Sequence, residues 1–197
     1  MPQPTEAQDP PRERSRRNGA RHGYGGDVAL FSRRRRLPDP VRRALDLRGD
    51  AVLAAAPLVD GRWVVTTRRA LHLVGTDGTV RVPWADVDRG SLDATTGTLT
   101  VHWVNGASTD LPLGPDSPAW DLTQSFRERV QQSVVHVEHV SLPGSGERVR
   151  VALRRDEDGA LFTQVIGPGD VDLADPGVAR QVALAERRVR AEAGLAP

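Results

Sequence analysis

The sequence predicts a mixed α+β protein, mainly antiparallel β-structure with a packed helix. Three observations indicate this fold class. Short β-type segments recur between residues 51 and 113 with turn residues between them, a spacing typical of sandwiches and barrels. An amphipathic helix follows at residues 117–130, and more β-type segments and a last helix lie beyond residue 134. A chain of 197 residues is long enough to bury a hydrophobic core.

Seven β-type segments make up the first part. Asp60-Gly61, Thr76-Asp77-Gly78 and Asn105-Gly106 are turn sequences, because Gly, Asn and Asp tolerate the backbone angles that tight turns require. Between these turns, residues 80–84 alternate apolar and polar side chains, as a half-buried strand does. The predicted strands are 51–58, 63–67, 70–74, 80–84, 91–94, 98–104 and 108–113.

The helix after these strands has a clear start and one apolar stripe. Ser117 is a candidate N-cap and Pro118 suits the first helical position. Its apolar residues recur every four positions and predict burial against the strands. We expect one core formed by Trp63, Leu71, Leu73, Val82, Leu99, Val101, Trp103, Leu122, Phe126 and Val130.

Two shorter regions flank this unit. Asp39-Pro40 has the form of a helix start, and a short helix is predicted over residues 41–47. After the main helix, the β-type segments 134–142, 148–153 and 160–165 predict an added C-terminal β-hairpin layer. A final helix is expected from Asp175-Pro176 to about residue 193, with Val178, Val182 and Val189 near one face.

The composition excludes several kinds of chemistry. All 27 basic residues are Arg, so no lysine is present for a P-loop or a Schiff base. The chain has no cysteine, which excludes disulfides and thiolate chemistry and fits a reducing compartment. The N-terminus lacks the apolar core of a secretory signal, and no stretch approaches a membrane span. We therefore expect a cytoplasmic protein.

Charge is unevenly distributed along the chain. Residues 1–50 hold 12 Arg and 7 acidic residues, whereas residues 51–197 hold 15 Arg and 19 acidic residues. Residues 1–27 contain almost no large apolar side chain and are predicted to be disordered. We therefore expect a disordered Arg-rich leader at 1–38, a main domain at 39–135, and a β-hairpin and helix extension at 136–197 packed on it.

No residue pattern indicates catalysis or metal binding. In a strand, His136 and Glu138 point to one face and His139 to the other, so these three cannot converge on one ion. Gly144-Ser145-Gly146 lacks the spacing of a nucleophile elbow and is typical of a hairpin loop. The sequence predicts a noncatalytic protein without a metal or cofactor.

Two stretches carry a family resemblance. The segment VVTTRRALHL (residues 64–73), followed by VPWADV (residues 82–87), resembles bacterial pleckstrin-homology-like (PH-like) domains over about Arg48 to Val135. The resemblance implies a seven-stranded antiparallel barrel or sandwich of two orthogonal sheets, plugged by the helix that carries Phe126. It also implies a binding module, since such domains bind phosphoinositides, peptides or other proteins.

Two sets of arginines are the candidate ligand-binding residues. Arg68 and Arg69 occupy a hairpin turn at which PH-like domains can place basic contacts. The leader carries the run Arg33, Arg34, Arg35 and Arg36, and guanidinium groups form paired hydrogen bonds to phosphate. We expect a protein-protein interaction or scaffold module. The alternative is that the Arg-rich leader binds nucleic acid or an anionic membrane surface.

Overall fold

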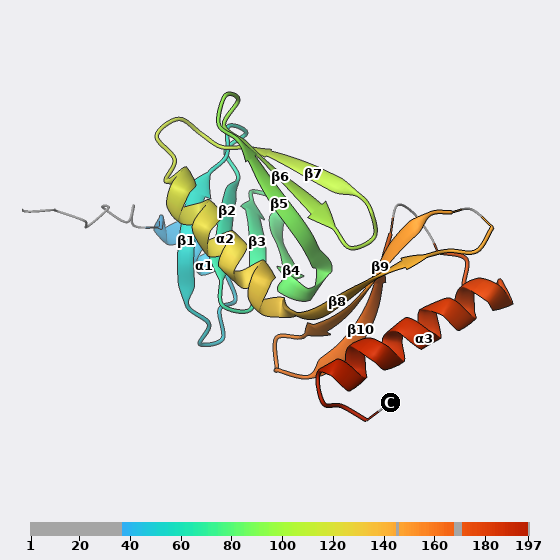
Figure 1. The fold of residues 1–197 in the computed structure, drawn as a ribbon. Coiled ribbons are helices and arrows are strands. Elements are labelled where there is room, and N and C mark those ends of the chain that lie inside the picture. The colour runs from blue at the N-terminus through green and yellow to red at the C-terminus, as the bar shows by residue number, and fades with distance from the viewer. Residues whose placement is uncertain (1–36, 145, 168–170, 197) are drawn as a thin grey trace, which may run out of the picture. The chain divides into compact units, whose positions relative to one another are not determined.

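The described part of the protein is a mixed α+β fold. The computed structural model describes residues 37–144, 146–167 and 171–196, which all lie in one compact unit of the chain. Within them, ten strands form three antiparallel sheets accompanied by three α-helices (Figure 1). The predicted mixed fold class is confirmed, and the described strands form no closed barrel. The predicted disorder of the leader and the run Arg33 to Arg36 lie outside the described residues.

The first sheet follows the predicted meander. Asp60-Gly61 and Thr76-Asp77-Gly78 connect neighbouring strands, and Gly61 and Gly78 have φ angles of 85° and 134°, which favour glycine. The strands pair in chain order. They are β1 (Val52–Pro57), β2 (Trp63–Thr67), β3 (Ala70–Gly75) and β4 (Gly78–Pro83).

The second sheet has the order β5-β6-β7 and begins after a single 3₁₀ turn, η1 (Trp84–Asp86). Its strands are β5 (Val87–Asp93), β6 (Thr98–Trp103) and β7 (Ser108–Pro112). An isolated bridge between Leu58 and Leu113 links the ends of the two sheets. β5 starts four residues before the predicted strand. It includes Asp88, Arg89 and Gly90, whose composition is typical of a turn and therefore did not predict a strand.

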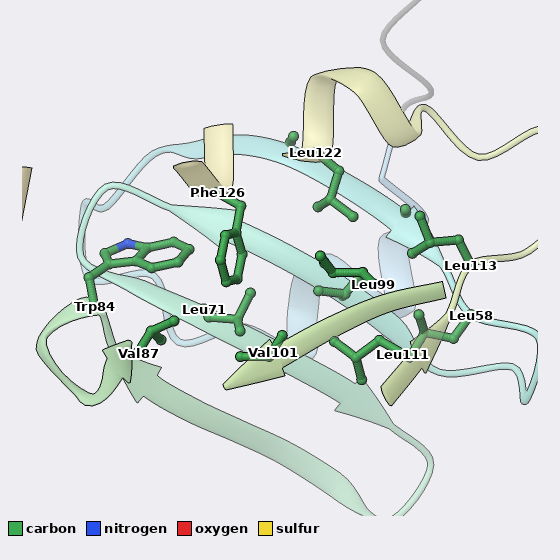
Figure 2. Close-up of a cluster of buried hydrophobic side chains, with 13 residues drawn as sticks. Leu58, Leu71, Trp84, Val87, Leu99, Val101, Leu111, Leu113, Leu122 and Phe126 are labelled. Atoms are coloured by element: carbon green, nitrogen blue, oxygen red, sulfur yellow. The ribbon is translucent and has the colours of Figure 1, made fainter. Parts of the chain in front are cut away.

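The helix α2 (Ala119–Ser133) packs against the core between the two sheets. Leu122 and Phe126 are buried and Val130 is partly buried, which confirms the predicted stripe. The Trp84 and Phe126 rings meet edge to face, with centroids 5.4 Å apart. Figure 2 shows the labelled core residues, which are Leu58, Leu71, Trp84, Val87, Leu99, Val101, Leu111, Leu113, Leu122 and Phe126.

The predicted core and helix start differ from the structure in some details, and Leu73, Val82 and Trp103 are only partly buried against the core. Trp63 packs with a second cluster, around Leu45, Val65 and Val74. That cluster also takes up residues next to the short helix α1 (Asp39–Ala44), on the face of the sheet away from α2. The Ser117 hydroxyl does not cap α2; it donates to the Pro57 carbonyl, 3.2 Å away.

The C-terminal region forms a three-stranded sheet rather than a hairpin. Its order is β10-β9-β8, with β8 (Val134–Ser141), β9 (Arg148–Arg155) and β10 (Leu161–Ile166). The helix α3 (Pro176–Glu192) packs on it through Val178, Val182, Ala185 and Val189, and Asp175 caps its first turn. α2 runs directly into β8, so the boundary expected after residue 135 lies inside that strand; the division into domains stays a prediction.

One fully buried arginine joins the third sheet to η1, the second sheet and α2. Arg154 of β9 has no exposed surface, and its Nη2 donates to the carbonyls of Trp84 (3.0 Å) and Val87 (2.8 Å) and to the Ser133 hydroxyl (2.6 Å). Burial lowers the pKa of Arg154, and the nearby Asp88 and Asp86 oppose that change. The three acceptors come from η1, β5 and α2, so Arg154 fixes how these elements meet β9.

Candidate functional site

A groove with a volume of about 500 Å³ lies between β5 and α2. Leu92 and Leu99 contribute from the second sheet, and Phe126 and Val130 contribute from the helix. These side chains belong to the main core or pack against it. Leu99 and Phe126 are buried in its floor, at 1% and 3% exposure, whereas Leu92 and Val130 are partly exposed.

Gly90 allows α2 to pack closely on β5. A Cβ atom at this position would lie 2.5 Å from Cε1 of Phe126, closer than packed carbon atoms approach. Only glycine lets the Phe126 ring cross the backbone of β5 without a shift of either element. The Phe126 ring therefore packs directly on one face of β5 at Gly90.

Polar and basic side chains form the rim. Arg89 comes from β5, and Gln124, Arg127 and Gln131 come from α2. Among the described residues, no carboxylate lies within the 4 Å ion-pair distance of Arg127, and none of those lining the groove is acidic. Arg89 makes only a long contact of 3.4 Å to Asp88, whose carboxylate also binds Arg150 at 2.7 Å. The rim is positively charged.

The strand beside the groove is an edge strand. β5 pairs with β6 on one side and with no other described strand. Alternate backbone N–H and C=O groups on its other side consequently lack a strand partner, which is the arrangement that accepts an added strand. Arg89, Gly90 and Ser91 are exposed along this strand.

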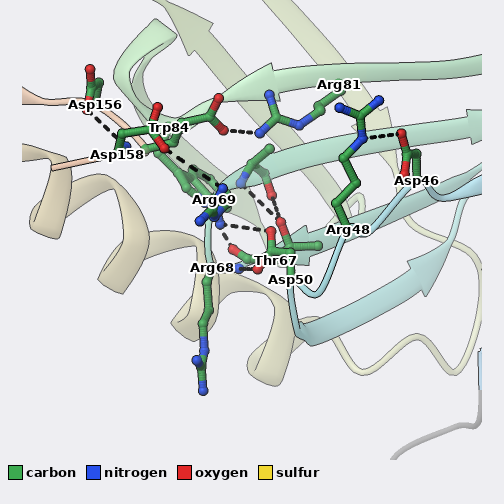
Figure 3. Close-up of polar contacts among 12 residues, drawn as sticks. Asp46, Arg48, Asp50, Thr67, Arg68, Arg69, Arg81, Trp84, Asp156 and Asp158 are labelled. Atoms are coloured by element: carbon green, nitrogen blue, oxygen red, sulfur yellow. Dashed lines mark hydrogen bonds and ion pairs between the residues drawn. The ribbon is translucent and has the colours of Figure 1, made fainter. Parts of the chain in front are cut away.

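Arg68 and Arg69 lie in the β2–β3 turn, outside the groove. Their backbone N–H groups both donate to the Asp50 carboxylate, at 3.1 Å each, and these hydrogen bonds fix the backbone of the turn (Figure 3). The Thr67 hydroxyl donates to the Ala70 carbonyl. The side chains of Arg68 and Arg69 are exposed. The structure therefore places these two predicted residues together, at a site separate from the groove.

His72 is buried next to this turn. Its Nε2 lies 3.4 Å from the Thr67 hydroxyl, and its Nδ1 has no hydrogen-bond partner. The Thr67 proton is used on Ala70, so Nε2 is the donor of this long contact. Burial is the main cause that lowers the pKa of His72 below 6.5, and Arg81 acts in the same direction.

We expect the free energy of unfolding to depend on pH through His72. The folded-state pKa lies below the unfolded value of 6.5, so the unfolded state binds the proton more readily. The contribution of His72 to the free energy of unfolding should be fully present above pH 6.5. It should decrease as the pH is lowered from 6.5 toward the folded-state pKa. Urea unfolding between pH 7 and pH 5 measures the dependence of the free energy of unfolding on pH, which should be weaker in His72→Leu than in the unmodified protein. An equal dependence in both proteins would contradict the role given to His72.

His136 and Glu138 of β8 each contact a side chain of α3. His136 lies 3.4 Å from Glu192, and the Glu138 carboxylate accepts from Nε of Arg188 at 2.8 Å. The described residues contain no group of three or more His, Asp or Glu side chains positioned to hold a metal ion. No helix in the described part of the chain has the length and apolar character needed to cross a membrane.

Sequence reasoning identified part of the site and missed the rest. It placed the apolar stripe of α2, yet it missed Arg89, Gly90 and Arg127. A glycine inside a β-type segment marks close approach of another group. Gly90 follows Asp88 and Arg89, and this polar sequence is not typical of a strand, so the signal was missed. Arg33 to Arg36 lie outside the described residues, so their part in any site stays a prediction.

The chain was compared with protein-family models, curated proteins and solved structures, and none of them matches it.

Proposed function

We propose that this protein is a noncatalytic, PH-like binding module that holds an extended acidic segment of another protein in the groove between β5 and α2. The observation that carries the proposal is the apolar groove beside an edge strand with a basic rim. Two sheets of four and three strands with one helix against their shared core support the PH-like assignment.

An extended peptide fits the groove through two kinds of contact. Its backbone pairs with the outward-facing N–H and C=O groups of β5, as an added strand does. Its side chains alternate between the two faces of the added strand, so apolar ones on one face contact the partly exposed Leu92 and Val130. The groove therefore selects a segment with alternating apolar residues.

The charge of the rim selects the sign of the ligand. Arg127 has no carboxylate partner among the described residues, and Arg89 has a weak one. Acidic side chains of a peptide would complete these pairs, and complementary charge mainly sets specificity and the rate of association. The body of the chain after residue 50 is net acidic, so the basic rim contrasts with its surroundings.

Peptide selection tests the proposal. We expect a displayed library of random peptides to yield binders with Asp or Glu among alternating apolar residues. Arg127→Glu should weaken these peptides by about tenfold, because like charges then face each other. Arg187→Glu, an exposed arginine of α3, is the matched control and should leave binding unchanged. Binders that lose no affinity in Arg127→Glu, or that depend on Arg33 to Arg36, would overturn the proposal in favour of another surface.

A further inference from the structure

A second cavity, small and lined by arginines, lies at the opposite end of α2 from its first turn. It has a volume of about 120 Å³. Three segments far apart in the sequence meet there: the β2–β3 turn with Arg68 and Arg69, the last turns of α2 with Arg129, and the end of β9 with Arg155. We call these four residues the arginine cleft.

Asp156 and Glu157 also line this cavity, and both carboxylates are engaged elsewhere. Glu157 is paired with Arg81. The Asp156 carboxylate accepts the backbone N–H groups of Asp158 and Ala160, at 2.9 and 2.8 Å, which closes the β9–β10 turn. Neither carboxylate is within the 4 Å ion-pair distance of an arginine of the cleft.

The arginines themselves are largely uncompensated. Arg69 approaches only Asp158, at 3.9 Å and with both side chains mostly exposed, a pair that contributes little. Among the described residues, Arg68, Arg129 and Arg155 have no carboxylate within 4 Å. Figure 3 shows the Arg68 side chain ending away from every drawn acid.

Arg129 supplies a second, independent sign of a missing partner. Its Nε is buried and has no hydrogen-bond acceptor. Buried donors in folded proteins are nearly always satisfied, and an unmet one costs stability. A donor of this kind beside three more guanidinium groups indicates an acceptor with several oxygens.

We infer that the arginine cleft binds a phosphate group. Guanidinium groups bind phosphate through paired, charge-assisted hydrogen bonds, and several of them converge here from three elements. The cleft is smaller than the 300 to 1,000 Å³ typical of whole-ligand pockets. It therefore accepts the phosphate itself, either as the free ion or as the exposed end of a small phosphate monoester.

A phosphate titration of the full-length protein tests the inference. The probes are inorganic phosphate and glycerol 3-phosphate, and sodium chloride at equal ionic strength is the reference. The arginine Nε–Hε signals in NMR spectra report binding, and the signal that disappears in Arg129→Gln identifies Arg129. Saturable shifts that include Arg129 are expected with phosphate and not with chloride. Equal shifts with chloride would show screening alone and would overturn the inference.

Variants separate the cleft from other basic surfaces. Arg129→Gln should weaken phosphate by about tenfold, and Arg155→Gln, at an exposed position, should weaken it in the same direction without loss of fold. Arg187→Gln should bind as the unmodified protein does. A protein with Arg33→Ser, Arg34→Ser, Arg35→Ser and Arg36→Ser should also retain binding. Loss of binding in this last variant alone would assign phosphate to the leader and contradict the inference.

Discussion

Changing Arg154 to alanine is expected to lower the free energy of unfolding by about 3 to 5 kcal/mol. The substitution removes the donor that satisfies two backbone carbonyls and the Ser133 hydroxyl. It also leaves a hole where a fully buried side chain stood. Urea unfolding monitored by tryptophan fluorescence measures the change.

Two further variants isolate the cause. Arg154→Met removes the same hydrogen bonds but fills most of the space, so we expect a smaller loss than for alanine because a smaller cavity remains. Arg155→Ala, the exposed neighbour, should change stability by no more than about 0.5 kcal/mol. A loss below about 1 kcal/mol in Arg154→Ala would show that the third sheet does not depend on this contact.

Changing Phe126 to alanine is expected to cost about 3 to 5 kcal/mol. The ring is 3% exposed, packs edge to face on Trp84, and would contact any Cβ atom added at Gly90. Its removal opens a cavity between α2, η1 and β5. The same urea unfolding experiment measures the loss.

The same helix offers a matched aromatic control. Trp120 is 74% exposed, so Trp120→Ala should stay within about 0.5 kcal/mol of the unmodified protein. Equal losses for the two variants would contradict the packing of α2 described above. A loss below about 1 kcal/mol for Phe126→Ala would place that helix on the surface.

Local patterns were sufficient to predict most of the elements. Asn105-Gly106 and Asp60-Gly61 marked hairpins because few residues adopt the angles that these turns need. The four-residue spacing of Leu122, Phe126 and Val130 predicted the buried face of α2, since that spacing returns to one side of a helix. Asp175 before Pro176 predicted the start of α3, and its carboxylate caps Gly177 and Val178.

The features missed from the sequence depend on tertiary contacts. Trp63 was expected in the main core, but both faces of the first sheet are covered and Trp63 packs on the face opposite α2. The sequence does not show that both faces are covered. Arg154 stands in a strand beside another arginine, and nothing local distinguishes the fully buried one from its exposed neighbour. Gly90 lies in β5, and Phe126, more than thirty residues later, packs on its backbone.

The same limit applies to the candidate sites. Arg68 and Arg69 were recognised because a turn concentrates them locally. Arg127 and Arg129 could not be assigned to different sites, because that division depends on which elements face each side of α2. The groove and the arginine cleft each combine segments separated by tens of residues.

Amide hydrogen exchange on the peptide-bound protein tests the groove most directly. With an acidic peptide from the selection bound, we expect slower exchange at alternate amides of β5 between Val87 and Asp93, because the added strand pairs with them. The other edge of that sheet, β7, should exchange as in the free protein. Protection confined to the β2–β3 turn, the third sheet or residues 1–36, with β5 unchanged, would contradict the proposed binding mode.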